Sequence, residues 1–181
     1  MHITYYLLPR KARYYLLQPE GRITYCLAKR DMNTVYFSLG ANLGNREQTL
    51  MEAIHLMEQR VGILLRCSSF YYSAPWGFQS EHDFCNICAS FQTHLPPDQV
   101  LAETQTIERE LGRLTKTCVN TEDGIPIYHD RTIDIDLLQY FDHQGNELII
   151  HTRLLTLPHP HIHERDFVRV PLQEILDSKT M

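Results

Sequence analysis

The eight residues 131–138, which read RTIDIDLL, constrain the fold of this chain more than any other stretch. Apolar and polar side chains alternate along them, which is the period of a β-strand with one buried and one open face. Asp134 and Asp136 therefore project from the same face and repel each other, an arrangement that folding alone does not require. Either the pair belongs to a solvated, charged strand face, or it binds Mg²⁺, which proteins hold with one or two carboxylates plus substrate phosphates. Arg131, at the entrance of the strand, is placed to bind phosphate oxygens.

The composition indicates one globular domain and excludes several kinds of partner. A chain of 181 residues is long enough for a domain with a substantial core. Its formal net charge of −5 argues against a general affinity for nucleic acid or for an anionic membrane. No run approaches the roughly 18 apolar residues that a membrane helix needs, and no signal peptide is recognisable. We therefore expect a cytoplasmic protein without nucleic-acid or membrane partners.

The five cysteines are an odd number without framework spacing, which fits a reducing compartment. Cys85 and Cys88 form a C-x-x-C, but a lone pair lacks the second ligand pair of a zinc site. The pair also lies inside a strand-like run rather than at a helix start, where a redox motif is typically found. We interpret both as small core residues.

Residues 1–33 differ from the rest of the chain. They mix Tyr-Tyr and Lys-Arg pairs without a sustained period, and a strong strand signal follows directly. We expect one domain over residues 34–181. The segment before it is then a disordered extension, or it results from a start codon assigned too far upstream.

Strands and helices alternate from residue 35 onward. The expected strands are 35–39, 63–71, 84–93 (half-buried), 131–138 and 147–150. Three helices are expected: the first follows an Asn45–Gln48 capping box, the second starts at Pro97, and the third covers 165–176 with an interruption at Pro171. This order predicts an α+β fold, with a mixed or antiparallel sheet and helices packed on it. Residues 113–128 form a long aperiodic loop, and such loops often serve as lids or binding loops. The chain has no glycine loop of the kinds that cradle nucleotide phosphates.

Four motifs occur in a characteristic order and spacing: SLGANLG at 38–44, PWG at 75–77, R-x-x-D-I-D-L-L at 131–138 and LPHP at 157–160. Together they resemble the 6-hydroxymethyl-7,8-dihydropterin pyrophosphokinase family. The resemblance runs from about Thr34 to Leu176 and leaves the first 33 residues outside.

The resemblance implies a ferredoxin-like α+β sandwich and an enzyme of folate biosynthesis. Such an enzyme transfers the β,γ-pyrophosphoryl group of its co-substrate ATP to the hydroxymethyl oxygen of the pterin and releases AMP. It implies two Mg²⁺ ions held by Asp134 and Asp136, which agrees with the strand alternation, and it adds Arg113 and Arg131 as catalytic residues. We expect a monomer that uses no histidine as a general base.

The resemblance also assigns the pterin pocket. In the family the pterin lies between two aromatic rings, which match Phe84 and Phe167 here, and Asn86 matches the amide that reads its hydrogen-bonding edge. The loop that lines the same pocket consists of Ser73, Ala74, Pro75 and Trp76. Taken alone, the two phenylalanines fit ordinary core packing better, and it is the flanking motifs that favour the pterin.

For ATP, Gln105 and Glu108 match positions on the adenine and ribose side. Their spacing places them on one helix face, off the buried stripe of Val100 and Ile107, and without the resemblance a solvated helix face explains them. The positions that match phosphate or nucleotide contacts are Arg113, Lys116, Arg131, Thr156, His159 and Arg165. His159, His161 and His163 also resemble a metal cluster, but no cysteine or carboxylate pattern completes it.

Two departures from the family pattern concern the nucleotide side. Relatives often have a small residue and then Pro, Ser or Ala before the signature arginine, where this chain has His129 and Asp130. The Asp130 carboxylate either weakens ATP binding or adds an outer contact to the metal. Thr115 replaces a second loop arginine of some relatives, with Lys116 beside it. Two other functions therefore stay open: a pterin- or nucleotide-binding protein that has lost turnover, and a phosphotransferase with an unrelated acceptor.

Overall fold

A computed structural model describes residues 15–17, 23–25, 32–113 and 129–177. The chain divides into two units, residues 1–32 and 33–181. In the first unit, β1 (Tyr15–Leu17) pairs with β2 (Ile23–Tyr25) as a short antiparallel ladder. Whether the first 33 residues are an extension or a mis-assigned start stays a prediction.

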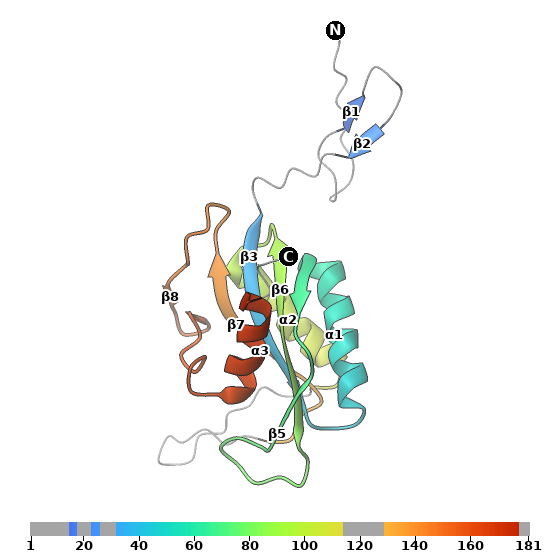
Figure 1. The fold of residues 1–181 in the computed structure, drawn as a ribbon, viewed down its shortest axis with the longest axis vertical. Helices are drawn as coiled ribbons and strands as arrows, with labels where there is room; N and C mark the ends of the chain where they lie inside the picture. Colours follow the sequence, from blue (N-terminus) through green and yellow to red (C-terminus); the bar gives the residue numbers. More distant parts are fainter. Residues whose placement is uncertain (1–14, 18–22, 26–31, 114–128, 178–181) are drawn as a thin grey trace. The chain divides into compact units, whose positions relative to one another are not determined.

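The second unit is built on an antiparallel sheet (Figure 1). Its strands are β3 (Asn33–Ala41), β4 (Ile63–Cys67), β5 (Tyr71–Ser73), β6 (Phe84–Thr93) and β7 (Asp134–Phe141). The order is β4–β6–β3–β7, with β5 paired to β6, and every pair is antiparallel. With a helix after β3 and another after β6, this is the β-α-β-β-α-β arrangement of ferredoxin-like folds. The predicted α+β class is confirmed, and the antiparallel alternative is the one that occurs.

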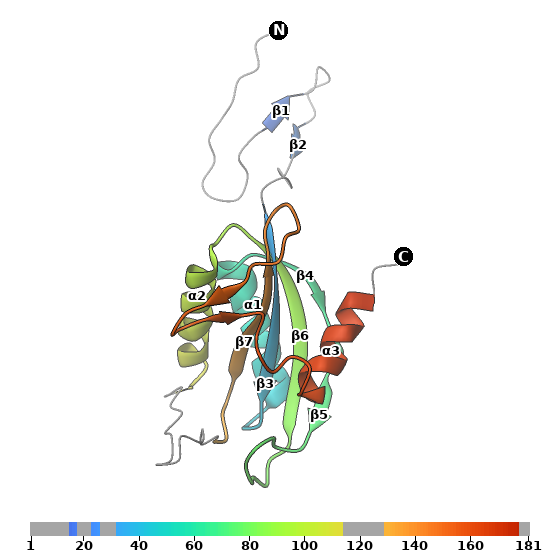
Figure 2. The ribbon, with the colours of Figure 1, turned by 90° about the vertical axis from the view of Figure 1, so that its left-hand side faces the viewer.

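Helices cover both faces of the sheet (Figure 2). The helices α1 (Arg46–Arg60) and α2 (Pro97–Glu110) lie side by side on one face, and α3 (Asp166–Asp177) covers the other. Asn45 caps the N-terminus of α1 as predicted, because its side chain accepts a hydrogen bond from the Gln48 amide at 3.3 Å. The Gln48 side chain bonds the Asn45 side chain at 3.1 Å, which differs from the reciprocal bond of a full capping box. None of the described helices has the length and hydropathy to cross a lipid bilayer.

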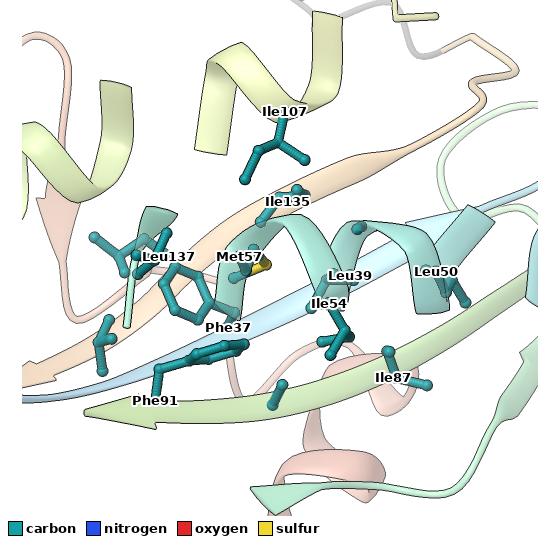
Figure 3. Close-up of a cluster of buried hydrophobic side chains, with 14 of the residues drawn as sticks. Phe37, Leu39, Leu50, Ile54, Met57, Ile87, Phe91, Ile107, Ile135 and Leu137 are labelled. Atoms are coloured by element: carbon teal, nitrogen blue, oxygen red, sulfur yellow. The ribbon is translucent and has the colours of Figure 1, made fainter. Parts of the chain in front are cut away.

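The main core lies between the sheet and the α1/α2 layer (Figure 3). Phe37 and Phe91, on the neighbouring strands β3 and β6, meet edge to face with ring centroids 5.7 Å apart. From the helices, Met57 points toward Phe37 and Ile107 toward Ile135, and both are fully buried. This core holds β3, β6 and β7 in register, and the register positions the site described below.

A second, smaller core under α3 changes the expected exposure of β6. Cys88 and Leu138 pack there against Val168, Leu172 and Ile175. With a helix layer on each side, β6 is buried on both faces, so the prediction of a half-buried strand was wrong. Cys85 and Cys88 are both fully buried, which confirms them as core residues. Burial chiefly raises the pKa of the Cys85 thiol to about 11, which keeps it unreactive.

The expected strand 63–71 is two strands, because the ladder breaks at Ser68. The Ser68 amide still donates to the Cys88 carbonyl at 2.9 Å, but the Cys88 amide donates to the Ser68 hydroxyl instead of to a backbone carbonyl. A side chain has thus replaced the main chain in the ladder. Residues after it resume pairing as β5.

Two further element predictions were wrong. Residues 147–150 return beside β7 only through an isolated bridge between Phe141 and Glu147, and β8 (Ile150–His151) pairs instead with β9 (Thr156–Leu157). The helix α3 runs without interruption through Pro171, which is itself buried. The apolar face that α3 packs against the sheet offsets the one hydrogen bond that proline removes.

Gly62→Ala is expected to lower the free energy of unfolding by about 3 kcal/mol. A Cβ atom at Gly62 would lie 2.0 Å from the Gln92 carbonyl oxygen, which is main chain and cannot rotate away. Urea denaturation measures the loss. Gly145→Ala is the comparison: its backbone is left-handed (φ +88°) but has nothing within 4 Å of the added atom, so it should lose only about 1 kcal/mol. Equal losses in the two variants would contradict the backbone clash.

Candidate active site

A pocket of about 350 Å³ opens on the α3 side of the sheet, where β3 ends and β6 and β7 begin. Strand pairing determines which side chains meet there. Gly40 on β3 lies directly opposite Asn86 on β6 and Asp134 on β7, and two residues earlier Ser38 lies opposite Asp136. Directly opposite residues share a face, so the amide and both carboxylates project into one pocket.

Because Gly40 has no side chain, the side chain of Asn86 can occupy the space beside it. A Cβ atom at Gly40 would lie 2.7 Å from Oδ1 of Asn86, closer than any ordinary contact. The Asn86 amide nitrogen donates to the Tyr71 carbonyl at 3.3 Å and to the Ser73 hydroxyl at 3.2 Å. These bonds orient the side chain, which is 2 % exposed, with its oxygen toward Gly40.

Arginines converge on the two carboxylates. Asp134 accepts hydrogen bonds from Arg113 and from Arg131, the latter at 2.5 Å. Arg165 lies 4.0 Å from Asp136. The carboxylate repulsion predicted from the sequence is therefore balanced by the neighbouring arginines, and all five groups line the pocket.

Glu108 lies behind this cluster rather than on a solvated helix face. It is 2 % exposed, and its Oε1 accepts from Arg113 and from the Ile135 amide, both at 2.7 Å. Its placement off the buried stripe of α2 was therefore wrong, because the chain turns at Gly112 (φ +91°) and the Arg113 amide comes back to the Glu108 carbonyl at 2.9 Å. Burial alone lowers the pKa of Arg113, but Asp134 and Glu108 outweigh it and raise the pKa above its usual value.

Arg131 lies ahead of β7 because its main chain is bonded elsewhere. Its amide donates to Oδ1 of Asn42 at 2.7 Å, and its carbonyl accepts from the Asn42 amide at 3.1 Å. The strand predicted to begin at Arg131 consequently begins at Asp134. This anchor places the guanidinium over the ring of Phe84, 5.5 Å from its centroid.

Aromatic rings form the other wall. Arg165 lies over Trp76, 4.5 Å from the ring centroid, and beside Phe167 at 5.9 Å. Phe78 meets Phe84 edge to face at 6.2 Å. The pocket thus joins a cationic, carboxylate-bearing part to an aromatic part, with Arg131 and Arg165 between them.

His159 reaches the pocket from the segment after β9, where its amide donates to the Leu138 carbonyl at 2.8 Å. Burial lowers the pKa of its ring; Asp136 opposes the shift, and Arg165 and His161 add to it. The ring is therefore uncharged at neutral pH and adds no positive charge to the pocket.

Most of the predicted site residues come together in this pocket: Ser73, Ala74, Trp76, Phe84, Asn86, Arg113, Arg131, Asp134, Asp136, His159, Arg165 and Phe167. Four do not line it: Pro75, Gln105, Glu108 and Thr156. Lys116 and Thr115 lie outside the described residues. The individual roles of all these residues stay predictions.

Seven lining residues were not among the predicted site residues: Ser38, Gly40, Phe78, His129, Asp130, Pro160 and His161. Ser38 and Gly40 belong to the first motif and are two residues apart, so strand periodicity together with that motif could have found them. Asp130 was noticed only as a departure from the family pattern. Phe78 carries no signal, because it lies in an irregular loop.

The α+β fold carries a pocket in which arginines and carboxylates adjoin an aromatic wall, a combination suited to an enzyme that binds phosphate beside a flat ring. Residues 36–177 match the family of 7,8-dihydro-6-hydroxymethylpterin-pyrophosphokinases. The chain belongs to this family and is a pyrophosphokinase of folate biosynthesis, as its motifs predicted.

Individual relatives agree with this assignment. A 2-amino-4-hydroxy-6-hydroxymethyldihydropteridine pyrophosphokinase from Porphyromonas gingivalis is 44% identical over 144 residues, which are 80% of this chain and 91% of the relative. One from Haemophilus influenzae is 39% identical over 145 residues, 80% of this chain and 82% of the relative. Among solved structures, the wild-type HPPK-DHPS of Plasmodium falciparum has a TM-score of 0.57 at 13% identity, covering 82% of this chain and 42% of that one. At that identity the structure supports the fold alone.

Proposed function

We propose that the chain transfers the pyrophosphoryl group of ATP to the hydroxymethyl oxygen of 6-hydroxymethyl-7,8-dihydropterin, with two Mg²⁺ ions held at Asp134 and Asp136. The observation that carries this proposal is the pairing of Asp134 with Arg113 and Arg131 in a pocket whose other wall is aromatic. The hydroxymethyl oxygen would attack the β-phosphorus, the bond from that phosphorus to the bridging oxygen of the α-phosphate would break, and AMP would leave with that oxygen. The hydroxyl proton is lost to solvent in the process.

The donor set at Asp134 and Asp136 fits Mg²⁺. Both ligands are hard carboxylate oxygens, and within the described ranges no group of three or more His, Cys, Asp and Glu side chains could complete an all-protein metal site. Mg²⁺ suits such an incomplete set, because it takes its remaining ligands from phosphates and water. When bound, it would neutralise charge on the transferring and leaving phosphates.

The arginines would exchange partners when the substrate enters. Arg113 and Arg131 now neutralise Asp134, and Arg165 faces Asp136. With Asp134 and Asp136 holding Mg²⁺, the guanidinium groups of Arg113, Arg131 and Arg165 would bind phosphate oxygens instead, bidentately and without losing their charge. The site would thus keep its net charge through the exchange, with the arginines already positioned.

On the aromatic side, Phe84, Asn86 and Phe167 would hold the pterin. A flat heterocycle gains dispersion and quadrupole contacts between rings, and the Asn86 amide supplies a hydrogen-bonding edge. Ser73, Ala74 and Trp76 complete that wall. The roles of Gln105, Glu108, Thr156 and Lys116 toward ATP, the monomeric state and cytoplasmic residence remain predictions from the sequence.

Incubation with ATP, Mg²⁺ and the hydroxymethyl-dihydropterin tests the proposal, with AMP as the expected product and chelation of Mg²⁺ as the control. Tight pterin binding without AMP would favour the alternative of a binding protein that has lost turnover. ADP or free pyrophosphate as the product would favour a phosphotransferase with a different acceptor.

Gly40→Ala is expected to raise the KM for the pterin about tenfold, because the new methyl group displaces the oxygen of Asn86. The displaced atom ends a side chain, so the fold should persist and the melting temperature should change little. Steady-state kinetics with varied pterin and varied ATP measure the effect. An unchanged pterin KM would show that Asn86 does not bind the pterin. Equal changes in both KM values would mean a general distortion of the pocket.

A further inference from the structure

Asp130 links two parts of the pocket wall that are far apart in the sequence. Its Oδ1 accepts a hydrogen bond from the Asn42 amide nitrogen at 2.6 Å. The Ser80 side chain interacts with the same carboxylate, and this interaction chiefly holds the pKa of Asp130 below its usual value. The carboxylate is therefore ionised at neutral pH and faces both partners.

The segment that Asp130 holds is the loop 77–83, which connects the PWG motif to β6. Phe78, at its start, lines the pocket and packs edge-on against Phe84. Near its end, the His82 amide donates to the Ser80 hydroxyl at 3.0 Å, and the His82 carbonyl accepts from Asn42 at 3.4 Å. The loop is thus attached through Ser80 to Asp130, ahead of β7, and through His82 to Asn42, which follows β3. Its end is attached at Asp83, whose carbonyl accepts from Arg46 at 2.7 Å.

The two ends of the Asn42 side-chain amide bind different groups, one on the loop side of the pocket and one on the side of Arg131. Asn42 is 3 % exposed, and its oxygen holds the Arg131 amide while its nitrogen holds Asp130. The Arg131 carbonyl is held by the main chain of Asn42, which no side-chain change removes. Loss of the Asp130 carboxylate therefore removes the attachment of the loop at Ser80, while the attachments at His82 and Asp83 persist and Arg131 stays anchored.

We propose that Asp130 is a positioning residue for the acceptor substrate: it fastens the loop 77–83 so that Phe78 and Phe84 form a fixed wall, and it takes no part in binding ATP. This rests on the proposed pterin side of the pocket. The cost of ordering the loop is met in the free protein, so the acceptor does not have to supply it on binding.

Asp130→Ala is expected to raise the KM for the pterin about tenfold, with kcat and the KM for ATP within about twofold of wild type. Ser80→Ala should do the same, and the double variant should be no worse than either single one, because both remove the same attachment. Asp130→Asn keeps an acceptor oxygen and should lie within about threefold of wild type. Glu81→Ala removes a carboxylate from the same loop, exposed and without these bonds, and should leave all three constants unchanged.

Several results would overturn the proposal. A changed Mg²⁺ dependence or ATP KM in Asp130→Ala would assign the carboxylate to the metal or nucleotide side instead. A lower melting temperature together with changes in kcat and in both KM values would mean that Asp130 has a general structural role. Additive effects of Asp130→Ala and Ser80→Ala would show that the two residues do not act through the same attachment. An inactive wild-type protein would refute the proposed function itself, whereas an active wild type with unaffected variants would refute only this role of Asp130.

Discussion

Asp134→Asn and Asp136→Asn are each expected to lower the rate of AMP formation by at least about 10³-fold. An amide has no net charge, so it weakens the Mg²⁺ site and leaves the arginines without the anion that they face in the free protein. Phosphoryl-type transfer depends mainly on positioning and electrostatic stabilisation, and these variants remove both.

The measurement is AMP formation at saturating ATP and pterin over a range of Mg²⁺ concentrations. Circular dichroism should show an intact fold, because Asp134 and Asp136 lie at the pocket and outside both buried clusters. Asp98→Asn is the matched control: it changes an exposed aspartate at the opposite end of α2 from Arg113 and should keep full activity. Near-wild-type activity in both site variants would end the assignment of the metal and phosphate site.

Glu108→Ala is expected to lower the free energy of unfolding by about 3 kcal/mol. The truncation leaves the largely buried Arg113 guanidinium with one carboxylate fewer and the Ile135 amide without its acceptor. Both losses occur where water does not easily replace the missing oxygen, and a buried cation that loses a partner is costly. Activity should fall as well, because Arg113 is no longer held against Asp134.

Glu110→Ala is the matched control for this loss. Glu110 lies two residues further along α2 and also pairs with an arginine, Arg60, at 2.7 Å. That pair is exposed to solvent, so its removal should have little effect on stability. Urea denaturation of the two variants measures the difference, and equal losses would show that burial of Glu108 contributes nothing.

The sequence alone identified the parts of the site that carry a local signal. Alternation along residues 131–138 placed Asp134 and Asp136 on one face, and the structure has them there, because the period of a strand depends only on its backbone. The four motifs identified the family because each of them is a short run of neighbouring residues that can be recognised without the tertiary structure. Capping at Asn45 was likewise predictable from local rules.

Predictions failed where a residue's environment comes from distant segments. Burial of β6 on both faces depends on α3, which follows some seventy residues later in the chain. Ser68 breaks a ladder that its own neighbours favour, because its hydroxyl accepts the Cys88 amide. Glu108 is buried because Arg113 and Ile135 reach it, and neither contact follows from the pattern of α2.

The sequence by itself therefore determined the fold class, the family and the two carboxylates of the site, since strand period, capping and short motifs act between near neighbours. Only the tertiary structure decided how these groups are connected. It placed Gly40 between Asn86 and Asp134, set Glu108 behind Arg113, and joined Asp130 through Asn42 and Ser80 to the loop 77–83. Those contacts depend on strand register and on packing between distant segments, which no local pattern encodes.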